Sequence, residues 1–345
     1  MIKIEESPTG DNLLWDIWMS TLHLAAVTVA DEIKLFEQLK DRNLTFQEIS
    51  EILQLESKAI KTLGELLMAL GFLIPQDDKV QLSHTSKIYL LSDSPYYWGA
   101  LLNKLRSRND HKRLLNAMLN KDSLLTHNGK SYSNMWEQGC ISPEAAAQFT
   151  EEMHATIFAP AVTAIKTDLF ENTKQLLDVG GGSGCFSITF THEYPDSKAT
   201  VFELPEVAQI SQKYIQKFKA EKNVLIHKGN FFNESDWPKE HDGILLSQIL
   251  HDWPIPICEQ ILGFAYRSLP TGGKIFIYEM LLEDQRISPL TTACFNTLMF
   301  INHRSQQFSS QEITHLLQKI GFTDIIVEPT FGYFSLIVGK KSNSP

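Results

Sequence analysis

Few features of secreted, membrane-bound or nucleic-acid-binding proteins occur in this sequence. Cysteine is scarce: the 345 residues include Cys140, Cys185, Cys258 and Cys294, which lie far apart and form neither a zinc motif nor a disulfide framework. Basic residues form no run, and the formal net charge is −10. We therefore expect free thiols and no nucleic-acid partner.

Long apolar runs are also missing. No apolar stretch of the sequence approaches the length of a membrane span. Residues 1–15 lack the apolar core and the small-residue cleavage site of a signal peptide. We therefore expect a cytoplasmic protein with no membrane partner. Because 43% of the residues are apolar, the chain can bury a sizeable core, and its length favours two domains.

The first half of the chain, up to about residue 170, has the pattern of successive helices. Apolar residues recur at helical spacing over residues 12–39. Thr45 and Glu48 then form the pattern of a capping box, and a second helix over residues 57–74 leads into a hairpin with its turn at Pro75–Asp78. Helix, helix and hairpin in this order predict a winged-helix arrangement.

The winged-helix pattern leaves DNA binding and dimerisation open. The second helix carries Lys58, Lys61 and Glu65 but no arginine, so a basic face for DNA is missing. The helix over Trp15–Ala30 is apolar nearly all round, as a helix buried in a subunit interface would be. We predict a structural or dimerising role for this half.

The second half alternates short apolar runs with helical segments. This alternation predicts an α/β fold with a Rossmann-like, mostly parallel sheet covered by helices on both faces. The last two strands are joined by a short turn at Thr330–Gly332, which predicts an antiparallel hairpin at the sheet edge. The expected strands are residues 175–179, 199–204, 224–229, 243–250, 274–280, 324–329 and 334–341.

A glycine-rich turn follows the first of these strands, in the stretch "QLLDVGGGSGCF". A dinucleotide turn needs the pattern G-x-G-x-x-G, but its third glycine position is occupied by Cys185 or Ser187 in the two possible registers. What remains is D-x-G-x-G-x-G, running from Asp178 to Gly184. No pyrophosphate has to be seated, and the carboxylate of Asp178 is free to accept a hydrogen bond from an ammonium group.

Two further elements follow at the ends of the next strands. Glu203 lies 25 residues after Asp178 (203 − 178), where an acid accepts hydrogen bonds from both ribose hydroxyls. Asn230 and Phe231 follow in "HKGNFF", where an amide and a ring are suited to hold an adenine. Each element alone also has an ordinary structural explanation, as a turn glycine, a capping acid or a core aromatic residue. Together, in this order, they predict a nucleoside site.

At these residues the chain resembles the class I S-adenosylmethionine-dependent methyltransferases. Within that class it is similar to the group of caffeic acid O-methyltransferase, acetylserotonin O-methyltransferase and bacterial natural-product O-methyltransferases. The stretches "DVGGGSG", "VFELPEV", "GNFF", "LHDWP", "LPTGGKIFIYEMLLED" and "LLQKIGFTDI" carry the resemblance, which covers nearly the whole chain.

The resemblance implies three segments and one cofactor. A winged-helix-like dimerisation domain is expected over 1–105, a helical linker that contributes to the acceptor pocket over 106–170, and the catalytic domain over 171–345. The protein is expected to be a homodimer that uses S-adenosylmethionine. The cofactor-binding residues that it implies are Asp178, Gly180, Gly182, Gly184, Glu203, Leu204, Gly229, Asn230, Phe231 and Ser247.

The predicted chemistry is the methylation of an aromatic hydroxyl. Methyl transfer from a sulfonium is an in-line displacement, so the enzyme has to align the acceptor and remove the proton of a phenol. His251 in "QILHDWP" is our candidate for the general base, because the pKa of histidine lies near neutrality. The resemblance implies that Glu279 orients His251 through its other nitrogen and that Asp252 fixes the loop or the cofactor.

Three residues depart from the pattern of the family. Gln307 lies where a second glutamate is often found, so that orienting contact becomes neutral or is lost. Asn230 replaces an acid that binds the cofactor, and Ser247 lies where plant relatives have a lysine.

The acceptor pocket is expected between the helical half and the sheet. Aromatic and methionine walls favour a flat, apolar acceptor, although the same residues at helical spacing also suit ordinary core packing. The candidates for its walls are Trp136, Phe149, Met153, His154 and Phe158 on one side and Phe295, Met299, Asn302 and His303 on the other.

Two alternatives stay open from the sequence. A metal-dependent C-methyltransferase of an α-keto acid would use His251, His303 and either Asp252 or Glu279 as metal ligands. A winged-helix regulator that has kept the fold but lost the cofactor is the other alternative, and the intact glycine turn argues against it.

Overall fold

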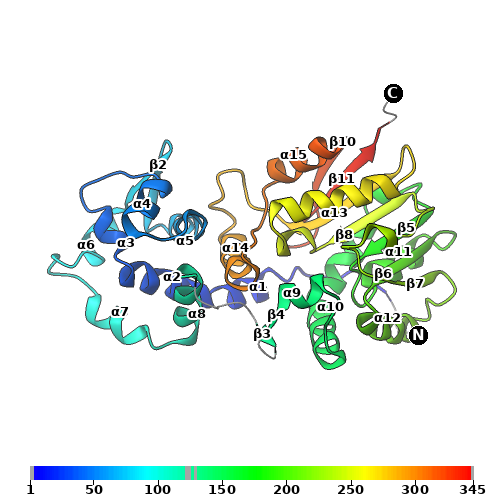
Figure 1. Cartoon of the computed structure of the whole chain (residues 1–345), viewed down its shortest axis with the longest axis horizontal. Helices are drawn as coiled ribbons and strands as arrows, with labels where there is room; N and C mark the ends of the chain where they lie inside the picture. Colours follow the sequence, from blue (N-terminus) through cyan, green and yellow to red (C-terminus); the bar gives the residue numbers. More distant parts are fainter. Residues whose placement is uncertain (1–3, 121–125, 128–129, 343–345) are drawn as a thin grey trace. The chain divides into compact units, whose positions relative to one another are not determined.

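The computed structural model describes residues 4–120, 126–127 and 130–342. The chain divides into two compact units. The first unit consists of residues 1–11, 128–281 and 310–345, and the second of residues 12–127 and 282–309. The second unit is therefore built from the N-terminal third of the chain and a segment inserted late in the sequence (Figure 1).

A seven-stranded sheet forms the centre of the first unit, with the strand order β10-β11-β9-β8-β5-β6-β7. Strands β5 to β9 pair in parallel, whereas β11 pairs antiparallel with both β9 and β10. The sequence prediction of a mostly parallel sheet with an antiparallel edge hairpin is confirmed. The strands are β5 (Gln175–Val179), β6 (Lys198–Glu203), β7 (Val224–Lys228), β8 (Gly243–Ser247), β9 (Lys274–Met280), β10 (Phe322–Pro329) and β11 (Phe334–Lys341).

Helices cover both faces of this sheet. The connections β5–α11–β6 and β6–α12–β7 advance in one direction across the sheet, while β8–α13–β9 advances in the other. Because such crossovers are right-handed, the two sets of helices lie on opposite faces. Helices α10, α11 and α12 pack on one another, and α13 packs on α15. The strands between these layers are buried on both sides, which explains their continuous apolar runs.

The remaining elements of the first unit are a short strand, the α-helices and some short 3₁₀ helices. Their bounds are β4 (Lys130–Ser131), α9 (Tyr132–Glu137), α10 (Pro143–Ile165), η1 (Asp168–Phe170), α11 (Cys185–Glu193), α12 (Pro205–Phe218), η2 (Glu234–Asp236), η3 (Leu250–Asp252), α13 (Ile255–Ser268) and α15 (Ser310–Ile320).

The second unit is mainly helical, and its strands β1 and β2 form a small hairpin. The predicted capping box is present, since Thr45 accepts from the backbone N–H of Glu48 and Glu48 accepts from that of Thr45. The hairpin pairs Leu73 with Leu82, and its turn consists of Asp77 and Asp78, which is shorter than the predicted turn over Pro75–Asp78. Its elements are α1 (Asn12–Met19), α2 (Thr21–Glu32), α3 (Leu35–Gln38), α4 (Phe46–Leu53), α5 (Ser57–Ala69), β1 (Leu73–Gln76), β2 (Lys79–Leu82), α6 (His84–Tyr89), α7 (Gly99–Leu105), α8 (Asn109–Met118), β3 (Thr126–His127) and α14 (Leu290–His303).

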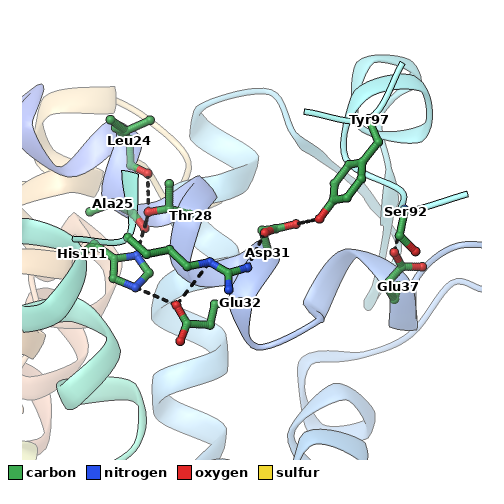
Figure 2. A network of polar contacts seen from close by, with 10 residues as sticks. Leu24, Ala25, Thr28, Asp31, Glu32, Glu37, Ser92, Tyr97 and His111 are labelled. Atoms are coloured by element: carbon green, nitrogen blue, oxygen red, sulfur yellow. Dashed lines mark hydrogen bonds and ion pairs between the residues drawn. The ribbon is translucent and has the colours of Figure 1, made fainter. Parts of the chain in front are cut away.

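A polar network inside the second unit holds α2 against the segments that follow it (Figure 2). Asp31 is buried and accepts hydrogen bonds from Tyr97 and Arg106 at 2.5 and 2.7 Å. His111 contacts Thr28 at 2.8 Å and Glu32 at 2.9 Å. Burial, together with the contact to Asp31, raises the pKa of Tyr97 to about 12. The hydroxyl of Tyr97 and the imidazole of His111 thus both have partners, whereas Nε of Arg106 makes no hydrogen bond with the residues that the structure describes and lies 3.4 Å from Glu32.

Two expectations about local structure were wrong. The run over Asn12–Glu32 is long and apolar enough to cross a membrane, although 50% of the apolar window is buried in the protein and such a run also occurs in core helices. The run is divided at Ser20 into α1 and α2, although Ser20 keeps right-handed helical angles, with φ of −59° and ψ of −20°. The strand expected over 243–250 ends at Ser247, because Gln248 has a positive φ of 56° that no strand can accommodate.

Candidate active site

The glycine turn connects β5 to α11 at the carboxyl end of the sheet. Gly180 and Gly182 have φ angles of 64° and 55°, in the left-handed region that favours glycine. A Cβ atom on Gly180 would lie 2.6 Å from the terminal carbon of Ile249, so a side chain here would need both a strained backbone and a shift of Ile249. A Cβ atom on Gly182 would meet nothing within 4 Å. The turn is therefore closed toward the loop after β8 and open at Gly182, where a ligand can approach the backbone.

Asp178 ends up inside this turn. Its side chain is buried, and Oδ2 accepts hydrogen bonds from the N–H of Ser187 at 3.3 Å and from its hydroxyl at 2.8 Å. Asp178 thereby caps the first turn of α11. Burial raises its pKa to about 6. The sequence did not identify Ser187 as a partner, and the predicted contact between Asp178 and an ammonium group stays a prediction.

Glu203, at the end of β6, binds the turn from the other side. Oε1 accepts from the backbone N–H of Gly182 at 3.0 Å, and Oε2 accepts from that of Leu204 at 2.9 Å. The side chain is 6% exposed, and burial raises its pKa to about 7. Each carboxylate oxygen keeps a lone pair for a second donor. The arrangement therefore suits a ligand with two neighbouring hydroxyl groups.

The loop after β7 lies next to the same turn. The ring of Phe231 is 3.5 Å from the position of a Cβ on Gly180. Asn230 uses its side chain within the protein, since its amide donates to the carbonyl of Glu137 at 2.9 Å and its oxygen accepts from the N–H of Phe232 at 3.0 Å. Asn230 thus ties this loop to the end of α9, and its predicted contact with a cofactor stays a prediction.

His251 lies in η3, just beyond the end of β8, and is 4% exposed. Its Nδ1 is 2.7 Å from Oε2 of Glu279, which is fully buried at the end of β9. Its Nε2 is 3.4 Å from Oδ1 of Asp252. The structure thus brings together the three residues that the sequence proposed for catalysis, while their roles stay predictions. Sequence reasoning missed Gln248, whose amide donates to Glu279 at 2.9 Å.

The surroundings of His251 act on its pKa in opposite directions. Burial lowers the pKa by disfavouring the charged ring. The carboxylates of Glu279 and Asp252 outweigh burial and raise the pKa of His251 to about 9. With Nδ1 held by Glu279, the imidazole has a fixed orientation, and Nε2 faces Oδ1 of Asp252.

The other residues proposed for cofactor binding lie at the ends of the strands and helices of the first unit, and their role stays a prediction. Gly184 precedes α11 with a φ of 75°. A Cβ on Gly229 would lie 2.9 Å from Phe202, so the loop needs glycine there. Ser247 is the last residue of β8, and Leu204 is the residue before α12.

Five candidates for the acceptor wall lie on α9 and α10. Trp136 packs against Phe149, with ring centroids 5.3 Å apart, and against a core cluster that includes Leu204. Met153 is half-buried on α10. His154 and Phe158 contact each other, with ring centroids 5.1 Å apart, and both contact aromatic rings of α12. Their part in an acceptor pocket stays a prediction.

The other four candidates lie on α14, in the second unit. Phe295 and Met299 are each 5% exposed. Asn302 accepts a hydrogen bond from Arg113 at 2.9 Å, and His303 is the last residue of the helix. Gln307 follows α14 and is fully buried, with no hydrogen-bond partner for its side-chain nitrogen and oxygen within the described part of the chain.

The metal-dependent alternative finds no support. His303 belongs to the second unit, whereas His251, Asp252 and Glu279 belong to the first. Within residues 4–120, 126–127 and 130–342, no group of three or more His, Cys, Asp or Glu side chains is arranged to hold a metal ion.

Comparison with known families and proteins gives consistent matches. Residues 112–323 match the model of the O-methyltransferase domain. The chain is 26% identical over 317 residues to 3-hydroxy-5-methyl-1-naphthoate 3-O-methyltransferase of Streptomyces sahachiroi, which covers 91% of this chain and 90% of that protein. It is 30% identical over 167 residues to acetylserotonin O-methyltransferase of Gallus gallus, and this match spans 48% of this chain but only about half, 47%, of that relative.

Solved structures show the same fold. An O-methyltransferase family 2 protein from Planctomyces limnophilus, solved with apigenin, superposes with a TM-score of 0.84 at 21% identity and covers 98% of both chains. Human N-acetylserotonin methyltransferase, solved with S-adenosylmethionine, superposes with a TM-score of 0.56 at 21% identity, covering 99% of this chain and 100% of that one.

Proposed function

The chain belongs to the O-methyltransferase family, and on this premise we propose that it transfers a methyl group from S-adenosylmethionine to a hydroxyl of an aromatic small molecule, with His251 as general base. One observation carries the proposal: a buried histidine is held by a buried glutamate at 2.7 Å, on a loop whose Ile249 packs against the glycine turn. The contact of Ile249 with the glycine turn supports the proposal, because it puts the loop of His251 next to the residues that we assign to the cofactor.

The residues around the turn fit S-adenosylmethionine. Glu203 has an unused lone pair on each oxygen for the two ribose hydroxyls. Phe231 lies beside Gly180, where an adenine can stack on its ring. The buried carboxylates of Asp178 and Glu203 both have raised pKa values and favour a ligand that is positively charged. We infer that Gly182, Gly184, Leu204, Gly229, Asn230 and Ser247 complete this site.

When bound, S-adenosylmethionine supplies a methyl group activated by the positive charge of its sulfonium. The protein has to position the acceptor and take its proton. Nδ1 of His251 is held by Glu279, so Nε2 takes the proton of the acceptor hydroxyl, and the oxygen becomes the nucleophile. Glu279 then stabilises the imidazolium that forms, because its carboxylate is 2.7 Å from the ring. Asp252 adds a second negative charge near Nε2.

The acceptor that we propose is a flat aromatic compound with a hydroxyl group. Trp136, Phe149 and Met153 offer an apolar wall in the first unit. The named relatives act on a hydroxynaphthoate and on acetylserotonin, which are both aromatic. We extend the same class of acceptor to this chain.

We further infer that the protein is a homodimer in the cytoplasm. Helix α1 exposes a row of large apolar side chains, with Leu13, Leu14 and Ile17 exposed by 70%, 71% and 61%. Such a patch is typical of a subunit interface. The cysteines are free thiols, and three of the four are buried, which agrees with a reducing compartment.

The test is a rate measurement with matched variants. His251→Ala should lower kcat by about 10²- to 10⁴-fold, the usual contribution of a general base. His192→Ala, at an exposed position of α11, serves as the control and should keep the wild-type rate. The wild-type rate should also survive treatment with EDTA. A rate that is unchanged in His251→Ala, or lost with EDTA, would overturn the proposal.

A further inference from the structure

The glycine turn has one side chain with which it can be anchored. Residues 180–184 are Gly-Gly-Gly-Ser-Gly, so Ser183 is the one residue of the turn with a side chain beyond hydrogen. Gly182 and Gly184 on either side have positive φ angles. Glycine loses more conformational freedom than any other residue when it is ordered. The position of this turn therefore depends on contacts made from outside it.

Three elements make such contacts. From β6, Glu203 accepts from the N–H of Gly182 at 3.0 Å. From α12, the hydroxyl of Ser211 donates to the carbonyl of Gly182 at 2.5 Å. From α10, Nδ1 of His154 is 2.8 Å from the hydroxyl of Ser183, which is 3% exposed. The first two contacts hold the backbone, whereas His154 holds the single side chain.

The ring of His154 is itself held in place. It lies against Tyr214 of α12, with ring centroids 4.1 Å apart and an interplanar angle of 34°. Phe158, one helical turn further along α10, packs against it at 5.1 Å. Burial, with a smaller contribution from Lys217, lowers the pKa of His154 to about 4. The imidazole is therefore neutral at neutral pH, and its contact with Ser183 is a hydrogen bond between two neutral groups.

We propose that His154 is a positioning residue for methyl transfer, which holds Ser183 and with it the glycine turn in the shape that binds S-adenosylmethionine. The proposal rests on the cofactor assigned above. It gives His154 a different task from lining the acceptor pocket, which was the prediction from its sequence position. Because Met153 and Phe149 lie on the same helix, the contact also links the cofactor turn to the helix that carries the proposed acceptor wall.

Two substitutions separate the hydrogen bond from ring packing. His154→Phe keeps a ring against Tyr214 but cannot bond to Ser183. His154→Asn loses most of the ring but keeps a polar atom at the position of Nδ1. If the hydrogen bond matters, His154→Phe should raise the Kd for S-adenosylhomocysteine by about 3- to 10-fold, the value of one hydrogen bond, and His154→Asn should restore most of the affinity.

Further variants show whether the effect passes through Ser183. Ser183→Ala should weaken binding at least as much as His154→Phe, since Ser183 also has a contact with the thiol of Cys185. The double variant with Ser183→Ala and His154→Phe should bind no more weakly than Ser183→Ala alone, because both changes remove the same contact and their effects are then not additive. His192→Phe, at an exposed site of α11, controls for the change of residue type and should bind as the wild type does.

The experiment is calorimetric titration of the full chain with S-adenosylhomocysteine, together with the thermal unfolding midpoint of each variant and the KM and kcat for S-adenosylmethionine. We expect KM to rise in His154→Phe with a smaller change in kcat and with a midpoint near that of the wild type. Wild-type affinity in His154→Phe, no rescue by His154→Asn, or independent losses in the double variant would overturn the inference alone. A wild-type protein that does not bind S-adenosylhomocysteine would overturn the cofactor assignment and this inference together.

Discussion

At the scale of single residues, the balance of burial and charge around His251 decides when it can act as a base. Burial lowers the pKa of the ring, but Glu279 and Asp252 raise it to about 9. His251 therefore carries a proton at neutral pH in the protein alone, and it becomes a base as the pH rises toward that pKa. A cationic cofactor bound nearby would lower the pKa again, because like charges disfavour the imidazolium.

The same balance has a consequence for stability. The pKa of His251 is raised in the folded state above the ordinary value of 6.5, so the favourable contribution of its ion pair is complete below about pH 6.5. It is lost as the pH rises through the folded-state pKa. The fraction of His251 that can act as a base thus rises with pH, whereas the contribution of its ion pair to stability falls.

Replacing Glu279 by glutamine tests the role of its charge. Glu279→Gln removes the largest of the effects that raise the pKa of His251, so the rising limb of kcat/KM against pH should move to lower pH. We expect kcat at the optimum to fall by about 10- to 100-fold, because the imidazolium formed in the reaction loses its carboxylate partner. Asp252→Asn, at 3.4 Å from Nε2, should move the limb in the same direction but less. Rate profiles that keep the wild-type limb in both variants would contradict this account.

At the scale of elements, the strands could be predicted from the sequence, whereas the side-chain contacts between elements could not. The strands of the parallel sheet read as apolar runs because helices cover them on both faces, and the turn between β10 and β11 is short enough to require a hairpin. The early end of β8 was not predictable, because glutamine at position 248 gives no sign of its positive φ. Contacts such as Ser187 with Asp178 or His154 with Ser183 join residues 9 and 29 positions apart, and no local pattern reveals them.

For the candidate site too, positions at strand ends could be predicted from the sequence, whereas contacts between elements could not. The sequence could propose the glycine turn, Glu203 and the histidine loop as site residues because each lies at the carboxyl end of a strand, where ligands bind in such sheets. The hydrogen bond from Asn230 to the carbonyl of Glu137 in α9 was not predicted from the sequence. It depends on how α9 packs against the loop after β7.

The exposed apolar face of helix α1 is the proposed dimer interface, and this can be tested by substitution. If its exposed apolar face forms the subunit interface, the combined change Leu14→Glu and Ile17→Glu should convert the dimer to a monomer, since charges placed in an apolar interface remain unpaired. The mass in solution, measured by light scattering after gel filtration, is the test.

A matched control comes from β7. Leu225 is 54% exposed in the first unit, and Leu225→Glu should leave the mass unchanged. A dimer that survives the α1 changes, or a wild-type protein that is monomeric, would contradict the proposed interface.

At the scale of the whole molecule, the two units carry different parts of the proposed reaction. The first unit holds the glycine turn, Glu203 and the pair of His251 with Glu279. The second unit contains the predicted dimer face on α1 and also α14. Helix α14 follows β9 in the sequence.

The central claim is that a hydroxyl oxygen receives the methyl group with the help of His251. The most direct measurement is NMR of the product formed from S-adenosylmethionine labelled with ¹³C in its methyl group, with hydroxylated naphthoates, indoles and flavones as acceptors. We predict a labelled methyl on oxygen, with a yield that falls by at least about 100-fold in His251→Ala. A label on carbon or nitrogen, or an equal yield from His251→Ala, would contradict the claim.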